Sequence, residues 1–305
     1  MNAPCSILIP TFNGKDILAE CMPSIAEQVA GRGGIDEIIV IDNASTDGTG
    51  DFLQKEYPQA RILTLEENKA IFALNDGAEA ARNPYLFLLN NDMILKDDCI
   101  DALMKPFDDE DVFAVTGKVF QWDRTTVQAA RRKPALNRGY FWPLEAETDE
   151  PGHTLYALGG QSVFARDKFL ALGGIDPLFS PFYHEDLDLS WRALRRGWKV
   201  LYNPEAEMIH KGAATAGRYF TSRQIQAIMQ KNLFLFMWKN LHAPGFVKSH
   251  VLWLLPRMMK ETLAGNFTFA AGLVGALRQL PDAMRARSAA RESQLSDADV
   301  LKIFE

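Results

Sequence analysis

Residues 6–10 and 37–41 read Ser-Ile-Leu-Ile-Pro and Glu-Ile-Ile-Val-Ile, and these two apolar runs decide the fold of the chain. Each run is short and ends at turn-forming residues, as a buried strand does. Residues 16–30 between them place Ile17, Leu18, Cys21, Ile25 and Val29 on one helical face. Strand, helix and strand in this order predict two parallel strands joined by a right-handed crossover.

The alternation of strand and helix continues as far as residue 89. Residues 61–65 predict a third strand, residues 70–81 a helix, and residues 85–89 a fourth strand. The fourth strand is apolar throughout, which is typical of a strand covered on both faces. We therefore expect an α/β fold with a mainly parallel, Rossmann-like sheet flanked by helices.

Beyond residue 89 the pattern is less regular. Residues 125–152 mix Arg, Pro, Trp and Glu without a period and predict a loop over the site. Residues 184–196 predict a helix. Short strands are expected at residues 114–120, 162–165, 200–202 and 208–209.

The last third of the chain shows helical spacing only. We place a boundary near Arg218, which divides the chain into residues 1–218 and a helical C-terminal extension, residues 219–305. The longest charge-free apolar run, residues 262–277, is interrupted by glycines and is shorter than the roughly 20 residues that span a bilayer. No transmembrane helix is expected.

The composition is that of a globular protein, with 47% apolar and 24% charged residues in 305. Cys5, Cys21 and Cys99 are far apart, so the sequence favours neither a disulfide framework nor a thiolate zinc site. The amino terminus lacks the basic start and cleavage site of a signal peptide. We therefore expect a cytoplasmic protein.

The charge of the chain is divided unevenly. The formal net charge of −6 argues against bulk nucleic acid as the main partner. Residues 1–205 sum to −12 and residues 206–305 to +6. The two parts are therefore expected to face different partners.

Polar clusters follow three of the predicted strands, at residues 10–14, 42–49 and 90–92. In an open parallel sheet, ligands bind beyond the carboxyl ends of the strands. Turn chemistry alone explains any one such cluster, since Asn, Asp, Ser and Gly are common in turns. Three of them at successive strand ends favour a binding site.

Four segments in order resemble the inverting family 2 glycosyltransferases of the GT-A fold: residues 7–14, 40–49, 88–92 and 184–189, the last with Arg192 and Gly197. The resemblance covers about residues 5–240. It implies a catalytic domain over residues 1–218 that transfers a sugar from a nucleotide diphosphate sugar, usually with a divalent metal.

The resemblance assigns a nucleotide-sugar pocket. Asp42 matches the family's nucleotide-binding aspartate, and Thr11 would line the same pocket. Around Asn68 the chain is one residue shorter than the family pattern, which affects the diphosphate and sugar contacts. The residues implied are Pro10, Thr11, Phe12, Asn13, Asp42, Asn68, Asn90, Asn91 and Gly160.

The resemblance also assigns a metal site. Residues 90–92, Asn-Asn-Asp, stand where the family has Asp-X-Asp, so Asp92 is expected to hold Mn²⁺ or Mg²⁺. Oxygen ligands suit these ions, and the metal would stabilise the leaving diphosphate. His210 follows a predicted strand where the family often has a further ligand, although a lone histidine is commonly structural.

The resemblance identifies Asp186, in the pair Glu185-Asp186, as the general base. Inversion requires a base that takes the proton of the acceptor hydroxyl. Glu185 is expected to raise the proton affinity of Asp186 through like charge. The alternative is that both carboxylates only stabilise the positive end of a helix.

Two interpretations of the C-terminal helices stay open. Their apolar side chains either pack within the protein or a homodimer, or lie on the anionic inner face of a membrane, where polyprenyl-linked acceptors are found. The basic residues behind them are Arg278, Arg285, Arg287 and Arg291.

The sequence therefore predicts a bacterial, metal-dependent, inverting enzyme that extends a polysaccharide or another glycan. Its donor would be a dTDP-sugar such as dTDP-rhamnose, or a UDP-sugar, and its acceptor a glycan or a polyprenyl-linked glycan. One alternative is a noncatalytic sugar-nucleotide or glycan-binding module. Another is a nucleotidyltransferase, which would need a glycine-rich phosphate loop that residues 10–15 do not supply.

Overall fold

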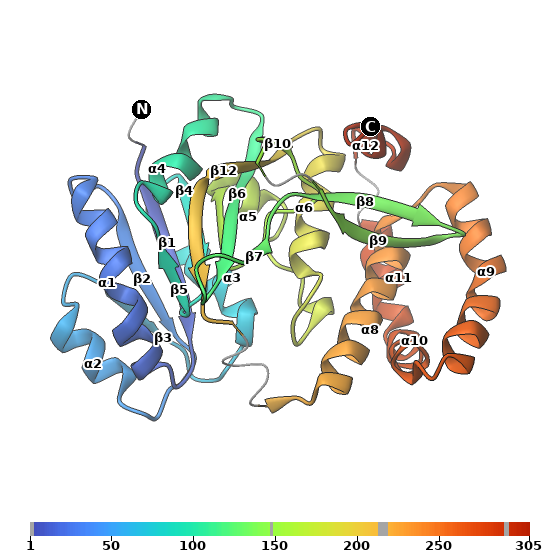
Figure 1. Ribbon diagram of the computed structural model, residues 1–305, viewed down its shortest axis with the longest axis horizontal. Coiled ribbons are helices and arrows are strands. Elements are labelled where there is room, and N and C mark those ends of the chain that lie inside the picture. The colour runs from blue at the N-terminus through green and yellow to red at the C-terminus, as the bar shows by residue number, and fades with distance from the viewer. Residues whose placement is uncertain (1–2, 147–148, 213–218, 290–292) are drawn as a thin grey trace.

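The computed structural model describes residues 3–146, 149–212, 219–289 and 293–305 (Figure 1). Its main sheet has the strand order β10-β12-β6-β11-β4-β1-β2-β3, with β5 paired to β12 and β7 paired to β6. The strands are β1 (Cys5–Thr11), β2 (Glu37–Asp42), β3 (Arg61–Thr64), β4 (Tyr85–Leu89), β5 (Met93–Leu95), β6 (Val112–Gln121), β7 (Val127–Ala129), β10 (Gly152–His153), β11 (Gln161–Ala165) and β12 (Lys199–His210).

The first four strands pair in parallel with one another, as the sequence predicts, and β6 and β12 form a second parallel pair. Strand β1 pairs in parallel with β2 on one side and β4 on the other, and β2 pairs in parallel with β3. The register sets Thr11 opposite Asp42, so β1 and β2 end level with each other. The polar residues that follow them therefore meet at one edge.

Two antiparallel pairings complete that edge. Strand β11 lies between β4 and β6 and is antiparallel to both, with Gln161 opposite Leu89. Strand β5 is antiparallel to β12, with His210 opposite Met93. The sheet thereby brings residues near 160 and 210 beside the segment that follows β4.

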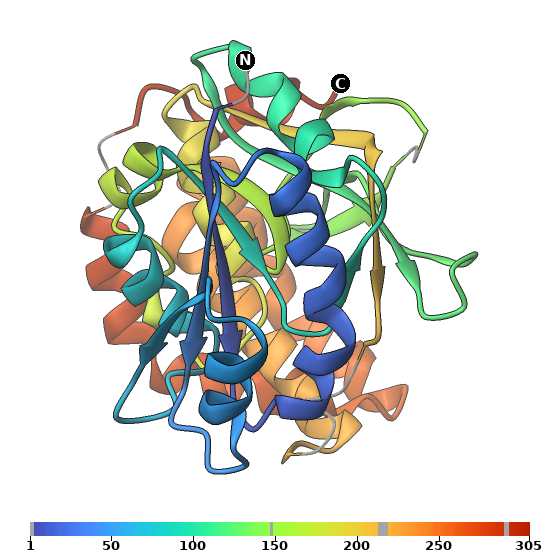
Figure 2. The same cartoon turned by 90° about the vertical axis from the view of Figure 1, so that its left-hand side faces the viewer.

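Helices cover both faces of the sheet. Alternate residues of β4 point to opposite faces, with Phe87 and Leu89 in one apolar cluster and Leu86 and Leu88 in the other. The first cluster includes side chains of α1 (Lys15–Gly31), α2 (Thr49–Glu56) and α4 (Cys99–Met104), and Figure 2 shows α1 in front of the strands. The second includes side chains of α3 (Ala73–Ala80), α5 (Arg166–Ala171) and α6 (Glu185–Arg195).

The prediction of a loop over residues 125–152 is wrong. The segment contains β7, the start of β10, and a hairpin of β8 (Arg132–Asn137) and β9 (Tyr140–Glu145). Pro134 lies opposite Pro143 in this hairpin. A two-stranded sheet has only edges, where proline is tolerated, so the prolines did not prevent strand formation.

Smaller boundaries also differ from the predictions. The two short strands expected at residues 200–202 and 208–209 are one strand, β12, with an irregularity between Tyr202 and Glu207. The helix expected at residues 70–81 begins as a 3₁₀ turn, Ala70–Phe72, and continues as α3. Cys5, Cys21 and Cys99 are free and buried.

The C-terminal region is helical, with α8 (Ser222–Asn240), α9 (Pro244–Leu263), α10 (Phe267–Arg278), α11 (Leu280–Ala289) and α12 (Asp297–Lys302). Phe234 and Phe236 of α8 belong to the same apolar cluster as Trp191 of α6. Of the described helices, none is long and apolar enough to cross a membrane. The predicted boundary at Arg218 and the predicted basic residue Arg291 lie outside the described residues.

Candidate active site

The ends of β1 and β2 are linked by hydrogen bonds between their loops. Asp42 is buried, and its Oδ1 accepts from Ser45 N at 3.0 Å. Asn13 N donates to Ser45 Oγ at 2.9 Å, and Asn13 Oδ1 accepts from Thr46 N at 2.8 Å. Both loops therefore form one rigid rim beside the Asp42 carboxylate.

The segment after β4 packs against the same rim. Asn91 Nδ2 donates to Thr11 Oγ1 at 2.9 Å. A Cβ on Gly14 would lie 2.2 Å from Thr11 Oγ1 and 2.7 Å from Asn91 Nδ2, so only glycine leaves room for this contact. Gly14 belongs to the segment that carries the resemblance, but the pocket residues assigned from the sequence did not include it.

Asn90 is held against β11. Asn90 N donates to Gly160 O at 2.9 Å, and a Cβ on Gly160 would lie 2.3 Å from Asn90 Cγ. The Asn90 side chain therefore lies directly over Gly160. The close approach explains the glycine at this position without any special backbone conformation.

Asp92 and His210 lie side by side across the β5–β12 pairing. His210 Nε2 is 3.2 Å from Asp92 Oδ1, and His210 Nδ1 is 3.2 Å from Gln128 Oε1. With its proton on Nδ1 donated to Gln128, a neutral imidazole turns its Nε2 lone pair toward the carboxylate. In that tautomer, Nε2 and the Asp92 carboxylate are two adjacent acceptors that can both ligate a metal ion.

The donor set at Asp92 and His210 fits a divalent metal that the substrate helps to bind. Among the described residues, no group of three or more His, Cys, Asp or Glu side chains could hold a metal by itself. Mg²⁺ sites that bind nucleotides commonly use one or two carboxylates together with substrate phosphates. Gln128 would orient the imidazole as an outer partner does in metal sites; no pattern in the sequence singled it out.

Glu185 and Asp186 open α6 after a strained turn. Tyr183 and His184 both have left-handed backbone, with φ of 74° and 69°. Asn232 of α8 holds this turn, because its Nδ2 donates to the carbonyls of Phe179, Phe182 and Tyr183 at 2.6–2.9 Å. Asn232 is fully buried, and no pattern in the sequence singled it out.

The backbone fixes the orientation of the Asp186 carboxylate. Its Oδ1 accepts from Leu187 N at 2.7 Å, and the N–H of Gly159 also donates to the carboxylate. Gly159 precedes Gly160, which contacts Asn90. One short turn therefore connects Asp186 with the segment that contains Asp92.

Burial dominates the protonation of the Glu185–Asp186 pair. Burial raises the pKa of Asp186, whereas the N–H groups of Leu187 and Gly159 lower it. Burial and then the adjacent Asp186 carboxylate raise the pKa of Glu185 further still, and Glu185 Oε2 has no hydrogen-bond partner among the described residues. Burial lowers the pKa of His184 to about 4, which keeps this imidazole neutral at pH 7. Because two backbone N–H groups donate to Asp186 and Glu185 Oε2 has no such partner, we expect Asp186 to lose its proton more readily than Glu185.

The remaining assigned residues are Pro10, Phe12 and Asn68. Phe12 is half-buried, with its ring 6.5 Å from that of Tyr219. Pro10 is half-buried near the end of β1. Asn68 is exposed, and its Oδ1 accepts from Ala70 N; no contact joins it to the other assigned residues in the described part of the chain. An open cavity of about 700 Å³ lies by α4 and is lined by none of these residues.

Comparison with known proteins identifies the family. The sequence model described as "Glycosyl transferase family 2" matches residues 6–172, more than half of the chain. The chain belongs to the family 2 glycosyltransferases. The N-acetylglucosaminyl-diphospho-decaprenol L-rhamnosyltransferase of Mycobacterium tuberculosis is 27% identical over 247 residues, which cover 72% of this chain and 79% of that protein. Glycosyltransferase GlyG of Streptococcus pneumoniae is 29% identical over 41% of this chain and 42% of its own.

Solved structures show that the glycosyltransferase has the GT-A fold, as the sequence predicts. GalNAc-T7 with UDP, GalNAc and Mn²⁺ matches with a TM-score of 0.58 and 16% identity, over 78% of this chain and 48% of that chain. This chain therefore spans about half of that structure. The mannosyltransferase PcManGT of Pyrobaculum calidifontis, in complex with GDP-Man and Mn²⁺, matches with a TM-score of 0.56 and 17% identity, over 98% of this chain and 78% of that chain.

A buried ionic cluster anchors α6 of the glycosyltransferase to α8. Asp188 is fully buried and accepts from Arg192 Nε at 2.8 Å, Lys239 Nζ at 2.7 Å and Asn240 Nδ2 at 2.7 Å. Lys239 also pairs with Asp176 at 2.7 Å. Burial raises the pKa of Asp188, but the Lys239 and Arg192 cations outweigh it and hold the pKa below its usual range. Asp188 therefore holds the helix that carries Asp186, two residues away.

Proposed function

We propose that this glycosyltransferase is an inverting enzyme in which Asp186 is the general base and Asp92 and His210 hold a divalent metal. The observation that carries the proposal is the environment of Asp186. Its carboxylate is oriented by two backbone N–H groups, and burial raises its pKa. The turn Gly159-Gly160 connects it with the segment that contains Asp92. A base with a raised pKa is closer to the operating pH than an ordinary aspartate.

In the proposed step, the acceptor hydroxyl gives its proton to Asp186 as its oxygen bonds to the anomeric carbon of the donor. The bond from that carbon to the diphosphate breaks on the opposite face, and the diphosphate leaves with the electron pair. Burial and the Asp186 carboxylate raise the pKa of Glu185, so Glu185 is expected to keep its proton while Asp186 is ionised. Residues 1–218 carry this reaction, and residues 219–305 support α6 through Lys239 and Asn240.

Asp92 and His210 would hold Mn²⁺ or Mg²⁺ together with the donor phosphates, and Gln128 would orient His210. The metal would stabilise negative charge on the leaving diphosphate. The buried Asp42 carboxylate would accept hydrogen bonds from the base or ribose, in the pocket formed with Thr11 and Asn13. Asn90 and Gly160 would line the sugar side of the same edge.

The relative from Mycobacterium tuberculosis suggests the substrates. Its name gives an L-rhamnosyl donor and a polyprenyl diphosphate-linked acceptor, and it matches 72% of this chain. We propose dTDP-rhamnose as the first donor to test and a lipid-linked glycan on the cytoplasmic side of the membrane as the acceptor. A UDP-sugar donor remains the second choice.

A donor screen tests the proposed function. Release of nucleotide diphosphate is measured for dTDP- and UDP-sugars with a lipid-linked acceptor, with chelator and with added Mn²⁺ or Mg²⁺. We expect one donor class to react only with metal, and the product to have the inverted anomeric configuration by NMR. Retention of configuration, or the same rate in chelator, would overturn the assignment.

Substitutions of Asp92 and His210 test the proposed metal site. Asp92→Asn and His210→Ala are expected to weaken metal-dependent donor binding by calorimetry, His210→Ala less than Asp92→Asn, because a carboxylate is the stronger ligand for these hard cations. Asp98→Asn, an exposed carboxylate after β5, is the matched control. Donor affinity that is equal in Asp92→Asn and the parent protein would rule out this site.

A further inference from the structure

Helix α9 lies at one end of the molecule and exposes an apolar row (Figure 1). Of its 20 residues only His250 is buried, and Figure 1 shows the helix at the end of the molecule away from β1–β3. Side chains four residues apart lie on one helical face. The exposed apolar row of α9 consists of Val247, Val251, Leu255, Met259 and Leu263, whose side chains are 39%, 71%, 58%, 56% and 86% exposed.

The neighbouring helix α10 continues the apolar surface. Its inner side chains, Phe269, Leu273 and Ala276, are buried. Its outer side chains Phe267, Val274 and Leu277 are 67%, 50% and 50% exposed. We refer to the exposed rows of α9 and α10 as the outer face. Exposed apolar rows on two packed helices are a candidate contact with another protein or a membrane.

The cations of the outer face have no partner that would neutralise them. Lys248, Lys260 and Arg278 are exposed and form no ion pair with any described residue. Residues 244–289 contain six Lys or Arg and two Asp or Glu, a net charge of +4. Of the two acids, Asp282 pairs with Arg285, and Glu261 accepts a hydrogen bond from the neutral amide of Asn266.

Two of the basic residues expected to form a membrane surface have other roles. Arg287 donates to the carbonyls of Trp238 and Leu241 at the end of α8, at 2.7 and 2.8 Å, so it packs within the protein. Arg285 is paired with Asp282. Of the residues expected there, Arg278 keeps an exposed charge with no ion pair in the described chain, and Lys248 and Lys260 of α9 are two further such cations.

We propose that the outer face of α9 and α10 docks on an anionic lipid surface, with the apolar rows among the acyl chains and the three cations at the headgroups. Amphipathic helices bind membranes in this way, parallel to the surface. A second copy of the chain fits less well, because a two-fold contact would bring together two surfaces of the same net positive charge. The docking itself needs only these residues; its benefit to a lipid-linked acceptor rests on the proposed function.

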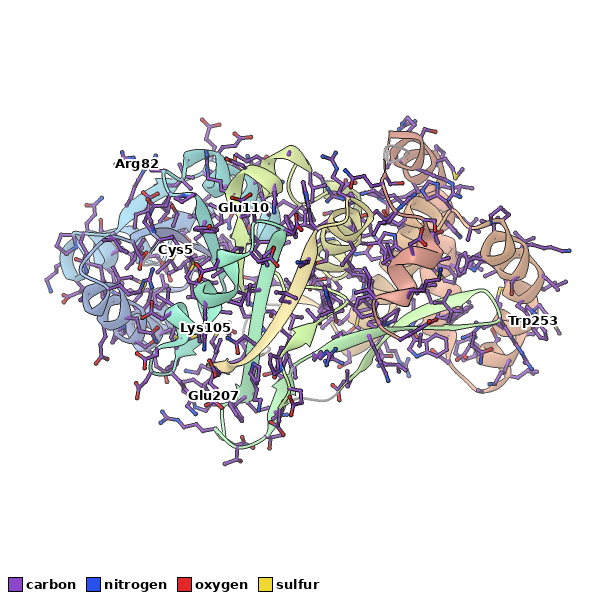
Figure 3. The ribbon with its side chains drawn as sticks, turned by 90° about the horizontal axis from the view of Figure 1, so that it is seen from above. Cys5, Arg82, Lys105, Glu110, Glu207 and Trp253 are labelled. Carbon is purple, nitrogen blue, oxygen red and sulfur yellow. The ribbon has the colours of Figure 1, made fainter. Side chains whose placement is uncertain are left out.

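The outer face lies at one end of the molecule, and the β8–β9 hairpin contacts the helix α9 that carries it (Figure 3). Figure 3 shows Trp253 of α9 at one end of the molecule and Arg82 at the other. Arg138 of the β8–β9 hairpin lies over the Trp253 ring at 4.3 Å, so the hairpin braces α9. Because Phe141 of the same hairpin packs on Trp191 of α6, the outer face is held rigidly relative to the helix of Asp186.

Vesicle sedimentation tests the proposal with the full chain. Vesicles of phosphatidylcholine with 30% phosphatidylglycerol are compared, as a probe, with phosphatidylcholine alone, at low and high salt. We expect binding only to the anionic vesicles, weakened by salt, since exposed charges are screened over about 8 Å at physiological ionic strength. Each cation near an anionic surface contributes about a factor of five, so Lys248→Gln/Lys260→Gln/Arg278→Gln should lower the partition coefficient about 100-fold.

Two further variants make the test specific. Lys55→Gln/Arg82→Gln/Arg124→Gln removes three exposed cations outside the outer face and should bind vesicles as the parent does. Leu255→Asn/Met259→Asn should abolish binding while circular dichroism and melting temperature stay unchanged, because both side chains are exposed. Equal binding by the two triple variants would overturn the proposal.

Light scattering measures the oligomeric state and so distinguishes a lipid surface from a second copy of the chain as the occupant of the outer face. A dimer that Leu255→Asn/Met259→Asn converts to a monomer, with no binding to anionic vesicles, would assign the outer face to a second copy and overturn the proposal. Vesicle binding by a chain that transfers no sugar would support the docking and count against the proposed function. Transfer to a soluble acceptor without vesicle binding would support the proposed function and overturn the docking.

Discussion

The protonation of one carboxylate determines the pH dependence that we expect. Burial raises the pKa of Asp186 above the ordinary aspartate value of about 3.9. A base works only when deprotonated, so kcat/KM should fall as the pH decreases through this raised pKa, and not near 3.9. A pH–rate profile with an acidic limb at 3.9 or below would contradict this account of the site.

The neighbouring carboxyl group gives a matched control for the profile. Burial and the Asp186 carboxylate raise the pKa of Glu185, so we expect Glu185 to keep its proton when Asp186 is ionised. Glu185→Gln replaces a neutral acid by a neutral amide of the same shape and should retain most of the turnover and the position of the acidic limb. If the limb shifts far toward acid in this variant, Glu185 carries charge and raises the pKa of Asp186, as the sequence first suggested.

The contact between Gly160 and Asn90 predicts a rescue. Gly160→Ala would place a Cβ 2.3 Å from Asn90 Cγ, so the Asn90 side chain must move and donor affinity should fall. Asn90→Ala also lowers affinity, but in the double variant Gly160→Ala adds little, since the clash is gone. Calorimetric donor titrations of the four proteins give the coupling; strictly additive losses would show that the two residues act separately.

At the scale of elements, α6 depends on the buried cluster around Asp188. Asp188→Asn leaves the Lys239 ammonium, whose side chain is 4% exposed, with Asp176 alone, and should lower the free energy of unfolding by about 3 kcal/mol. Urea denaturation measures this loss. Asp109→Asn removes the surface pair with Lys199 and should cost much less. A loss in Asp109→Asn as large as that in Asp188→Asn would contradict the role assigned to the cluster.

The same cluster sets a direction for stability against pH. The pKa of Asp188 is lower in the folded protein than in the unfolded chain. Its contribution is therefore complete above the unfolded value of about 3.9 and is lost as the pH falls through the lower, folded value.

Sequence patterns predicted the strands in which residue composition, apolar run length and flanking turn residues all indicate the same structure. Strands β1, β2 and β4 are short apolar runs closed by turn residues, and they lie where the pattern places them. The β8–β9 hairpin escaped prediction because Pro134 and Pro143 argue against strands, and its turn, Arg138-Gly139, lacks the usual Asn-Gly signal. Its stability comes from Phe141 packing on Trp191 and Phe236, contacts with residues more than 45 positions away.

At the scale of the whole molecule, the site is assembled by sheet order, which local sequence does not encode. Strand β11 enters between β4 and β6 in the opposite direction and sets Gly160 beside Asn90. Pairing of β5 with β12 sets His210 beside Asp92. The resemblance named most of these residues from their motifs, whereas Gly14, Gln128 and Asn232 act through contacts that only the fold reveals.

One measurement tests the central claim that Asp186 is the base. The turnover of Asp186→Asn is measured at saturating donor and acceptor, together with its donor affinity by calorimetry. We predict unchanged donor affinity and a turnover lower by about 10²–10⁴, because the carboxylate acts only when the acceptor hydroxyl attacks. A turnover equal to that of the parent protein would remove Asp186 from the mechanism.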